Sequence, residues 1–504
     1  MEVINLGIKI PKSQVPKNKI IRTNTIFTVK KDGAYKARIV CKGDLQDSTS
    51  YNEIDTSVLN MDSLKLLLII ANNKNMFLRT FDINHAFLYA PIDTKLYITH
   101  LEDQRYVTPL RKALYGLKQS PKRWNDTLKQ YMNSIGLYDS IYSPGLFVSQ
   151  DANVMIAAYV DDCIIAATSE NIIDDYIKKM KNKFSLKEIG IMQNDILDTD
   201  ILGIDLIYKK SEGVIQLKMK SYIEKLAEEY NDIINNGDKQ IKVPHLTKYD
   251  IDPRKDDLEL NKSELKKKIK YLQEIIGKLN YIRSRGRIDL EYAVGKISRL
   301  VLYPHEKVIN ATHKILQYVY QTKDIGLTFL RDEEMNKEIN ITIISDASLA
   351  SEYDLKSRGG AIIWLGRNLF HGFSKKSSVL CDSSAEAELD AMNTAEKIGL
   401  LLKLKLEKIT FNRIKINTRL ITDSKPGLEW LKQDYIKPRT KFIGIRLERL
   451  KERIMNKEIE IKKIEGKKNV ADPFTKSVPE EQFEQVRKIM KHELTPQMLL
   501  QLTS

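Results

Sequence analysis

The sequence predicts an N-terminal α+β part, a helical middle and a C-terminal α/β part. Its 504 residues have room for about three or four domains. An apolar content of 42% with 30% charged residues is typical of globular domains. Strand-like apolar runs recur before residue 205, basic amphipathic stretches follow, and a new strand–helix pattern begins at "INITIISDAS", residues 339–348.

The first part opens with a predicted hairpin and a helix. Residues 26–42 contain two β-rich runs that flank "KKDG", and Asp-Gly is a strong turn signal. A helix is expected over residues 63–75, with Asp62 or Ser63 as its N-cap. The stretch "MFLRTFDINHAF", residues 76–87, follows as a strand that runs into a turn.

A second helix and a strand pair complete this part. The helix is expected over residues 120–136, with Pro121 in its first turn. The stretch "VMIAAYVDDCIIAA", residues 154–167, predicts two apolar strands with Asp161 and Asp162 at their junction.

Residues 205–330 are expected to form long basic helices, because apolar residues recur at helical spacing beside Lys and Arg. The charge-rich "RDEEMNKE", residues 331–338, predicts a linker. Beyond it we expect strands at 339–348, 419–424 and near 459–464, a helix from Ser383, and a helical tail over 478–504.

The net charge of +15 favours a polyanionic partner, since Lys and Arg replace counterions along a phosphate backbone. Improved solubility is the alternative explanation. Three scattered cysteines suit a reducing compartment and exclude a CxxC zinc site, and the histidines form no HxxxH pair. Apolar runs stay far below the roughly 20 residues that span a membrane, so no membrane association is expected.

The first set of acids follows predicted apolar strands. Asp161 and Asp162 interrupt one apolar stretch, and Asp82 ends another. A polar hairpin tip would explain the pair, but charges beside buried strands cost several kcal/mol unless they are compensated. Three carboxylates at neighbouring strand ends would form an oxygen cage that suits Mg²⁺.

These acids lie in motifs that resemble reverse transcriptases of copia-type (Pseudoviridae) LTR retrotransposons, close to those of yeast elements. The resemblance implies a right-hand polymerase, with fingers and palm over residues 1–204 and thumb or connection helices over 205–330. The matching stretches, in order, are "YKARIVCKGDLQ", "FDINHAFLYAPI", "KALYGLKQSPKRW", "YVDD" and "DILGIDL".

The resemblance implies roles for individual residues. Asp82 and Asp161 would hold two Mg²⁺ ions for phosphoryl transfer, with Mn²⁺ as an alternative ion and Asp162 beside them as a supporting acid. Phe87 matches the residue that excludes a ribose 2′-hydroxyl. Lys31 and Arg38 match residues that grip the incoming triphosphate; without the family match, they would be interpreted as exposed basic residues on a hairpin. The implied nucleotide-binding residues are Lys31, Arg38, Phe87, Tyr115 and Gln119.

A second set of acids resembles the ribonuclease H domain that follows the polymerase in these elements, here expected as an α/β ribonuclease H-like domain over residues 338–477. The matching stretches are "SDAS", "AELDA", "TDS" and "ADPFTK". The resemblance implies that this set also binds two Mg²⁺ ions and directs a water at RNA in a hybrid. The implied catalytic and metal-binding residues are Asp346, Glu388, Asp423 and Asp472.

Two of these assignments have structural alternatives. Ser383 and Glu386 form an S-x-x-E capping box, which gives Glu386 a structural role and leaves Glu388 as the ligand. Asp472 has a helix N-cap as its alternative. Its motif also departs from that of relatives, which usually have an apolar residue in place of Pro473.

The implied function is an RNA-directed DNA polymerase with ribonuclease H activity. Its implied partners are an RNA template, DNA, RNA–DNA hybrid, deoxynucleoside triphosphates, and the integrase and capsid parts of a polyprotein. A cytoplasmic virus-like particle is the implied location, with the nucleus as a second one. A catalytically inactive nucleic-acid-binding descendant and a DNA-templated polymerase are the alternatives. The missing protease triplet and zinc cluster suggest a processed product, a truncated copy or a fragment.

Overall fold

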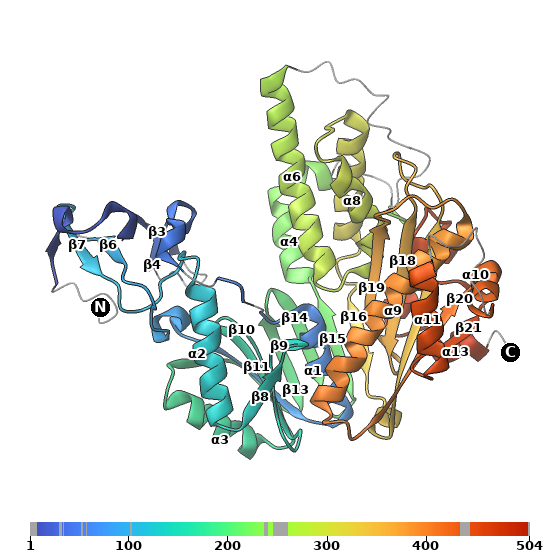
Figure 1. The fold of residues 1–504 in the computed structure, drawn as a ribbon, viewed down its shortest axis with the longest axis horizontal. Helices are drawn as coiled ribbons and strands as arrows, with labels where there is room; N and C mark the ends of the chain where they lie inside the picture. Colours follow the sequence, from blue (N-terminus) through green and yellow to red (C-terminus); the bar gives the residue numbers. More distant parts are fainter. Residues whose placement is uncertain are drawn as a thin grey trace. The chain divides into compact units, whose positions relative to one another are not determined.

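The computed structural model describes residues 8–29, 33, 35–51, 54–56, 58–100, 103–235, 240–244, 261–433 and 444–501. The chain divides into two compact units (Figure 1). The first contains Met1–Leu67 and Phe77–Ile191, and the second contains Leu68–Met76 and Met192–Ser504. Within the described residues, no helix combines the length and the apolar character that crossing a membrane requires.

The first unit is built around a six-stranded antiparallel sheet with the order β12-β5-β11-β10-β9-β8. Helices α2 (Ser120–Ser134) and α3 (Glu170–Lys181) supply Trp124, Ile173 and other apolar side chains to the core that they share with this sheet. The strands are β5 (Phe77–Ile83), β8 (Leu137–Ser140), β9 (Ser143–Ser149), β10 (Val154–Tyr159), β11 (Asp162–Ala167) and β12 (Leu186–Ile191).

The predicted N-terminal hairpin is confirmed. Strands β3 (Thr23–Val29) and β4 (Tyr35–Cys41) pair antiparallel as a separate two-stranded sheet. Lys31, which lies between these strands in the sequence, is outside the described residues. A small four-stranded sheet accompanies the hairpin, with β1 (Ile10–Pro11), β7 (Tyr106–Pro109), β6 (Tyr97–Thr99) and β2 (Ile20–Ile21) in that order.

Helix α1 (Met61–Asn73) confirms the first predicted helix, but its cap differs from the prediction. The side chain of Asn60, rather than that of Asp62 or Ser63, accepts a hydrogen bond from the Ser63 N–H at 2.9 Å. This acceptor satisfies one of the unpaired amides of the first turn. Nearly every α1 side chain is buried, which explains the uninterrupted apolar run Leu66–Ala71 in its middle.

The expectation of helices alone over residues 205–330 is wrong at both ends. A four-stranded sheet has the order β13-β14-β15-β16; its first three strands precede the helices in the sequence and β16 follows them. Its strands β14 and β15 alternate buried and half-buried residues, a period of two that the basic composition obscured. The strands are β13 (Ile196–Ile201), β14 (Ile204–Lys209), β15 (Val214–Lys218) and β16 (Leu327–Leu330).

The helices of this region bury the predicted apolar stripe. In α6 (Lys262–Ser284) the residues Leu272, Ile275, Ile276, Leu279 and Ile282 are all buried. The other helices are α4 (Lys220–Glu229), α5 (Asn231–Asn235), α7 (Glu291–Ile297) and α8 (Glu306–Gln321).

The C-terminal part is a five-stranded sheet with the order β19-β18-β17-β20-β21. Its first three strands are antiparallel, whereas β20 and β21 join in parallel. Helix α9 (Ser384–Ile409) packs on β17, β18 and β20, and α10 (Lys425–Leu431) and α11 (Gly444–Met455) pack against α9. The strands are β17 (Glu338–Ser348), β18 (Arg358–Leu365), β19 (Asn368–Lys376), β20 (Lys415–Thr422) and β21 (Glu460–Lys463).

Two segments predicted as peripheral are packed into the second unit. In the expected linker, a 3₁₀ turn over Glu333–Asn336 buries Met335, and the Arg331 Nε donates to the Asn72 carbonyl at 2.9 Å. The helical tail forms α12 (Glu480–Met490) and α13 (Pro496–Gln501). Phe483 of α12 is buried, and its ring lies 6.2 Å from that of Tyr318.

Candidate active sites

The first acid set begins at the tight turn between β10 and β11. Tyr159 pairs with Asp162, so Val160 and Asp161 form the turn. Val160 has φ of 58°, a conformation that β-branched residues rarely adopt. Two hydrogen bonds hold the turn: the Trp124 Nε1 donates to the Val160 carbonyl at 2.8 Å, and the Ile83 N–H donates to the Asp161 carbonyl at 2.9 Å. The neighbouring core therefore fixes the backbone that presents Asp161.

Asp82 approaches this turn from the neighbouring strand. In the β11–β5 ladder Asp162 lies directly opposite Asp82, a position in which Cβ atoms are about 5 Å apart. Burial, then the charge of Asp161, raises the pKa of Asp82, and the charges of Lys36 and Lys187 oppose that rise. Antiparallel pairing therefore brings the three predicted acids to one end of the sheet.

Predicted nucleotide-binding residues gather beside these acids. The ring of Phe87 contacts that of Tyr115 edge-on, with centroids 4.7 Å apart. Burial, then the charge of Asp161, raises the pKa of Tyr115, and Arg38 on β4 lowers it. Lys36, also on β4, acts on Asp82 through its charge; it lies in the same basic hairpin motif but was not predicted as a nucleotide-binding residue.

Gln119 differs from the other predicted contacts because it is completely buried. Its Oε1 accepts a hydrogen bond from the Gln46 Nε2 at 2.8 Å, and the Gln46 Oε1 accepts one from the Lys118 N–H at 3.0 Å. These bonds hold the loop that carries Tyr115. A nucleotide contact by Gln119 remains a prediction, as does that of Lys31.

The same loop packs directly on the hairpin. The Cys41 N–H donates to the Tyr115 carbonyl at 2.7 Å. Gly116 has φ of +89°, and a β-carbon there would collide with the carbonyl oxygen of Cys41. Only glycine fits both this conformation and this close approach. Gly116 thus couples the position of Tyr115 to that of strand β4.

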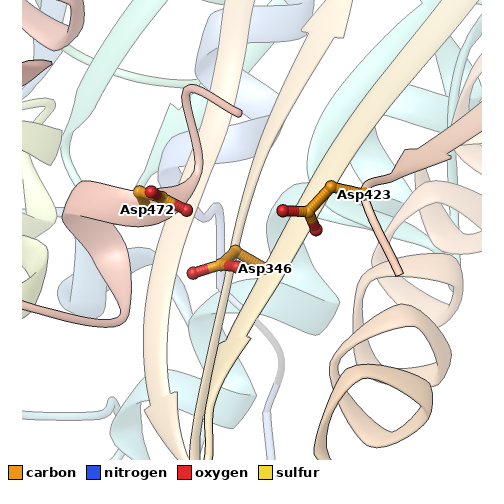
Figure 2. A group of neighbouring side chains, drawn as sticks. All are labelled: Asp346, Asp423 and Asp472. Carbon is orange, nitrogen blue, oxygen red and sulfur yellow. The ribbon is translucent and has the colours of Figure 1, made fainter. Parts of the chain in front are cut away.

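The second acid set meets at one edge of the C-terminal sheet (Figure 2). Parallel pairing of β17 with β20 brings Asp346 and Asp423 to the same edge, and Asp472 enters from the start of a 3₁₀ turn. One carboxylate oxygen from each of the three lies within 4.8 Å of the other two. Figure 2 shows their carboxylates pointing toward a common centre. It is the one such cluster found in the part of the chain that the structure describes.

Glu388 joins this cluster from α9. Its Oε1 accepts a hydrogen bond from the Ala347 N–H at 3.1 Å, next to Asp346. Its Oε2 and the Oδ1 of Asp423 are shielded from solvent and have no hydrogen-bond partner among the described residues. Buried carboxylate oxygens without donors are the ligands that a hard divalent cation requires.

Burial and the neighbouring acids raise the pKa values of Asp346 and Glu388. Burial, then the charge of Asp472, raises the pKa of Asp346 to about 7. Burial, then the charges of Asp346 and Asp423, raises the pKa of Glu388 to about 9. A bound cation would reverse this, because nearby positive charge favours the ionised form. The donor set therefore fits a divalent metal.

The choice between Glu386 and Glu388 follows from their hydrogen bonds. The Ser383 Oγ accepts from the Glu386 N–H at 3.3 Å, as a capping box requires. The Glu386 Oε2 accepts from the N–H of Asp382 at 2.7 Å, one residue earlier than the capping box predicts. Glu386 therefore serves the helix start, and Glu388 faces the acids.

Asp472 is not the N-cap of its turn, since Ala471 takes that position. Its Oδ2 accepts from the Gln482 Nε2 of α12 at 2.8 Å. Two neighbours not assigned from the sequence also reach the acids: the Thr475 Oγ1 donates to Asp346, and the Lys476 Nζ lies 3.1 Å from the Asp472 Oδ1. Thr475 and Lys476 both lie in the "ADPFTK" motif, but only the fold determines that their side chains point toward the acids.

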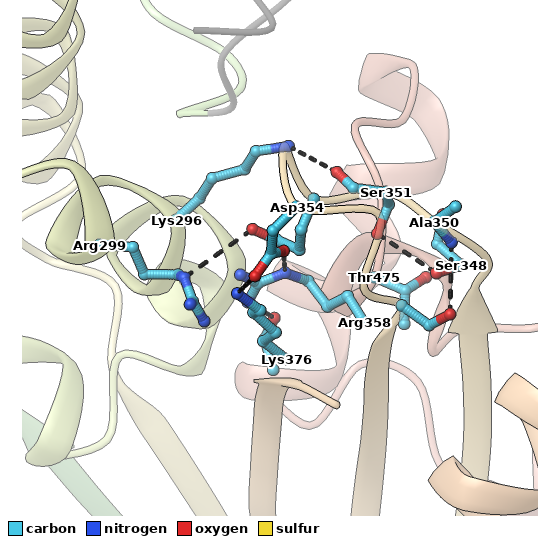
Figure 3. Close-up of polar contacts among 12 residues, drawn as sticks. Lys296, Arg299, Ser348, Ala350, Ser351, Asp354, Arg358, Lys376 and Thr475 are labelled. Carbon is cyan, nitrogen blue, oxygen red and sulfur yellow. Dashed lines mark hydrogen bonds and ion pairs between the residues drawn. The ribbon is translucent and has the colours of Figure 1, made fainter. Parts of the chain in front are cut away.

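The loop between β17 and β18, residues 349–357, is anchored by ion pairs (Figure 3). Glu352 and Arg358 are almost completely buried and pair at 2.6 Å. From the preceding helices, the Arg299 Nε lies 3.9 Å from Glu352. The Lys296 Nζ donates to the Ser351 carbonyl at 3.3 Å, as Figure 3 shows. Residues outside the C-terminal sheet thus hold the loop next to the acid cluster.

Comparison with known proteins agrees with this geometry. Residues 8–244 match the family described as reverse transcriptase (RNA-dependent DNA polymerase). The chain is 30% identical over 478 residues to the Transposon Ty1-NL2 Gag-Pol polyprotein of Saccharomyces cerevisiae (strain ATCC 204508 / S288c). That alignment covers 94% of this chain and 27% of the relative, so the chain spans about a quarter of its length.

A solved structure shares the fold. The foamy viral protease-reverse transcriptase dRH, in complex with ds DNA, is 15% identical, with a TM-score of 0.52. The alignment covers 94% of this chain and 68% of that one. The predicted fold class, a right-hand polymerase followed by an α/β ribonuclease H-like domain, is confirmed. The family match and the identity along 94% of the chain show that it resembles the reverse transcriptase region of copia-type retrotransposon polyproteins.

Proposed function

We propose that this chain copies RNA into DNA and cleaves the RNA strand of the resulting hybrid, with a separate carboxylate site for each reaction. One observation carries the proposal: acids far apart in sequence converge at strand ends in two different sheets. The first set is Asp82, Asp161 and Asp162, and the second is Asp346, Glu388, Asp423 and Asp472.

In the polymerase site, Asp82 and Asp161 act as the metal ligands and Asp162 supports them. Two Mg²⁺ ions, or Mn²⁺ in their place, would lower the pKa of the primer 3′-hydroxyl and neutralise charge on the leaving pyrophosphate. The fixed Val160–Asp161 turn favours this role because its backbone is already hydrogen-bonded on both sides.

The surrounding side chains select and hold the nucleotide. Lys36 carries positive charge near Asp82, and Arg38 carries it near Tyr115, where a triphosphate would need neutralisation. Lys31 belongs to the same sequence motif. Phe87 is buried and backed by Tyr115, so its ring cannot retreat from a ribose 2′-hydroxyl. This rigidity supports its role as the group that selects deoxynucleotides.

In the ribonuclease H-like site, the second acid set holds the metal ligands. Two divalent cations would activate a water toward the phosphodiester and stabilise the leaving oxygen. Ala347 and Thr475 donate hydrogen bonds that orient Glu388 and Asp346, so two ligands are positioned in advance.

The wider proposal includes the sequence-based domain division: fingers and palm over 1–204, thumb or connection over 205–330, ribonuclease H over 338–477, and a tail over 478–504. The substrates are an RNA template, DNA, RNA–DNA hybrid and deoxynucleoside triphosphates, which suit the net charge of +15. Integrase and capsid parts of a polyprotein would accompany the chain in a cytoplasmic virus-like particle, and the nucleus is a second location.

Extension of a DNA primer on an RNA template with Mg²⁺, followed by an assay for hybrid cleavage, tests the proposal. We expect extension with deoxynucleotides and then shortening of the template RNA. A chain that binds the primer–template but neither extends nor cleaves would be an inactive descendant, contrary to the proposal. Extension on DNA templates alone would support the DNA-templated alternative.

A further inference from the structure

Lys476 is a cation placed within an acid cluster. Its Nζ lies 3.1 Å from the Asp472 Oδ1 and 3.7 Å from the Asp346 Oδ2. The Lys476 N–H also donates to the Asp472 carbonyl at 3.1 Å, so one helical turn fixes the lysine above that acid. About half of the side chain is buried, since 45% of it is exposed.

Among the four acids, the ammonium group forms ion pairs with Asp346 and Asp472. Three buried oxygens of the cluster have no hydrogen-bond partner among the described residues: the Glu388 Oε2, the Asp423 Oδ1 and the Asp472 Oδ1. The ammonium lies within ion-pair distance of the Asp472 oxygen, whereas its charge acts on Glu388 and Asp423 from farther away. A single positive charge cannot compensate four neighbouring carboxylates. The lysine therefore offsets part of the repulsion and leaves the remaining oxygens available to a metal.

An ammonium and a divalent cation cannot share the same oxygens. Mg²⁺ binds carboxylate oxygens at about 2.1 Å and demands nearly octahedral geometry, which leaves no room for a lysine between its ligands. The two cations also repel each other. Because the Lys476 stem is flexible and partly exposed, the ammonium can move outward when a metal enters.

We propose that Lys476 is a built-in counter-cation that competes with the metal for the Asp346–Asp472 pair and sets the metal concentration at which the ribonuclease H-like site fills. This inference rests on the proposed function, because it requires that the second acid set binds a divalent cation. Lys476 would then have two effects: its charge stabilises the metal-free site and weakens metal binding.

Calorimetric titration with Mg²⁺, without nucleic acid, tests the inference. The full chain carries Asp161→Asn to remove binding at the polymerase site, and Lys476→Met removes the charge while it keeps most of the stem. Lys415→Met is the control, since Lys415 is exposed at the other end of β20 from Asp423. We expect Lys476→Met to bind Mg²⁺ about tenfold more tightly, and Lys476→Arg and the control to stay within about twofold of the parent.

The unfolding temperature of the metal-free chain is a second measurement. Lys476→Met should lower the unfolding temperature in EDTA, because the acids lose their counter-cation, and Mg²⁺ should remove the difference from the parent. If Lys476→Met does not fold, Lys476→Gln takes its place in both measurements.

Two failures have different meanings. Unchanged or weaker Mg²⁺ binding in the folded Lys476 variant would overturn the competition and leave the metal site intact. Binding in the parent that Asp346→Asn does not reduce would instead show that the second acid set is not a metal site, which would refute the proposed function.

Discussion

Replacing Asp346 with Asn should stabilise the metal-free chain at alkaline pH. The Asp346 side chain is only 3% exposed, and burial raises its pKa from 3.8 to about 7. The fold therefore favours the protonated carboxyl. Its stabilising contribution is complete below about pH 4 and is lost as the pH rises through about 7.

The magnitude follows from this pKa change. A tenfold change in proton affinity equals about 1.4 kcal/mol, so the ionised Asp346 costs the folded state up to about 4 kcal/mol at pH 8. An Asn side chain keeps the oxygen that accepts from Thr475 and removes the charge. We expect Asp346→Asn to gain about 2–4 kcal/mol in free energy of unfolding at pH 8 in EDTA, and little near pH 4.

Urea unfolding in EDTA measures this difference. Two of the three tryptophans, Trp364 and Trp430, lie in the second unit and report on it by fluorescence. Asp390→Asn is the control, because Asp390 pairs with Arg446 at 3.2 Å and should gain nothing. Equal or lower stability of Asp346→Asn at pH 8 would contradict the reasoning, since burial and the neighbouring acids would then not penalise the ionised carboxylate.

Three further substitutions test other parts of the structure. Glu352→Gln leaves the buried Arg358 unpaired and should lower the free energy of unfolding in urea by about 3–5 kcal/mol. Glu338→Gln, in an exposed pair, should lower it by less than about 1 kcal/mol. Equal losses in the two variants would refute the buried-pair argument. Gly116→Ala should abolish primer extension because its β-carbon collides with the hairpin, but Gly136→Ala, with φ of +84° and open space, should only lose about 1–2 kcal/mol of stability. Normal extension by the Gly116 variant would show that the loop can shift. Phe87→Ala should incorporate ribonucleotides in a primer-extension assay, and unchanged sugar selection would exclude it as the selecting group.

Much of the fold could be predicted because the signals are local. The Asp-Gly turn predicts the β3–β4 hairpin, and Ser383 marks the start of α9. Strands β14 and β15 were missed because their lysines and the neighbouring helices gave the region a helical, basic character. The cap of α1 was missed because Asn60 precedes two other plausible capping residues.

The acids could be predicted because many of them lie at the ends of apolar strands. The residues that surround them in the fold could not be predicted. Lys36 reaches Asp82 only through the hairpin's position, and Gln482 reaches Asp472 from a helix that the sequence described as a tail. The contact of Arg299 with Glu352 joins residues from different predicted parts. Such contacts depend on tertiary packing, for which the sequence carries no local pattern.

The most direct test measures primer extension and hybrid cleavage on the same preparations of Asp161→Asn and Asp346→Asn. Because the two acid sets belong to different sheets, we predict that Asp161→Asn loses extension and keeps cleavage, and that Asp346→Asn does the reverse. Loss of both activities in either folded variant would contradict two separate sites in one chain.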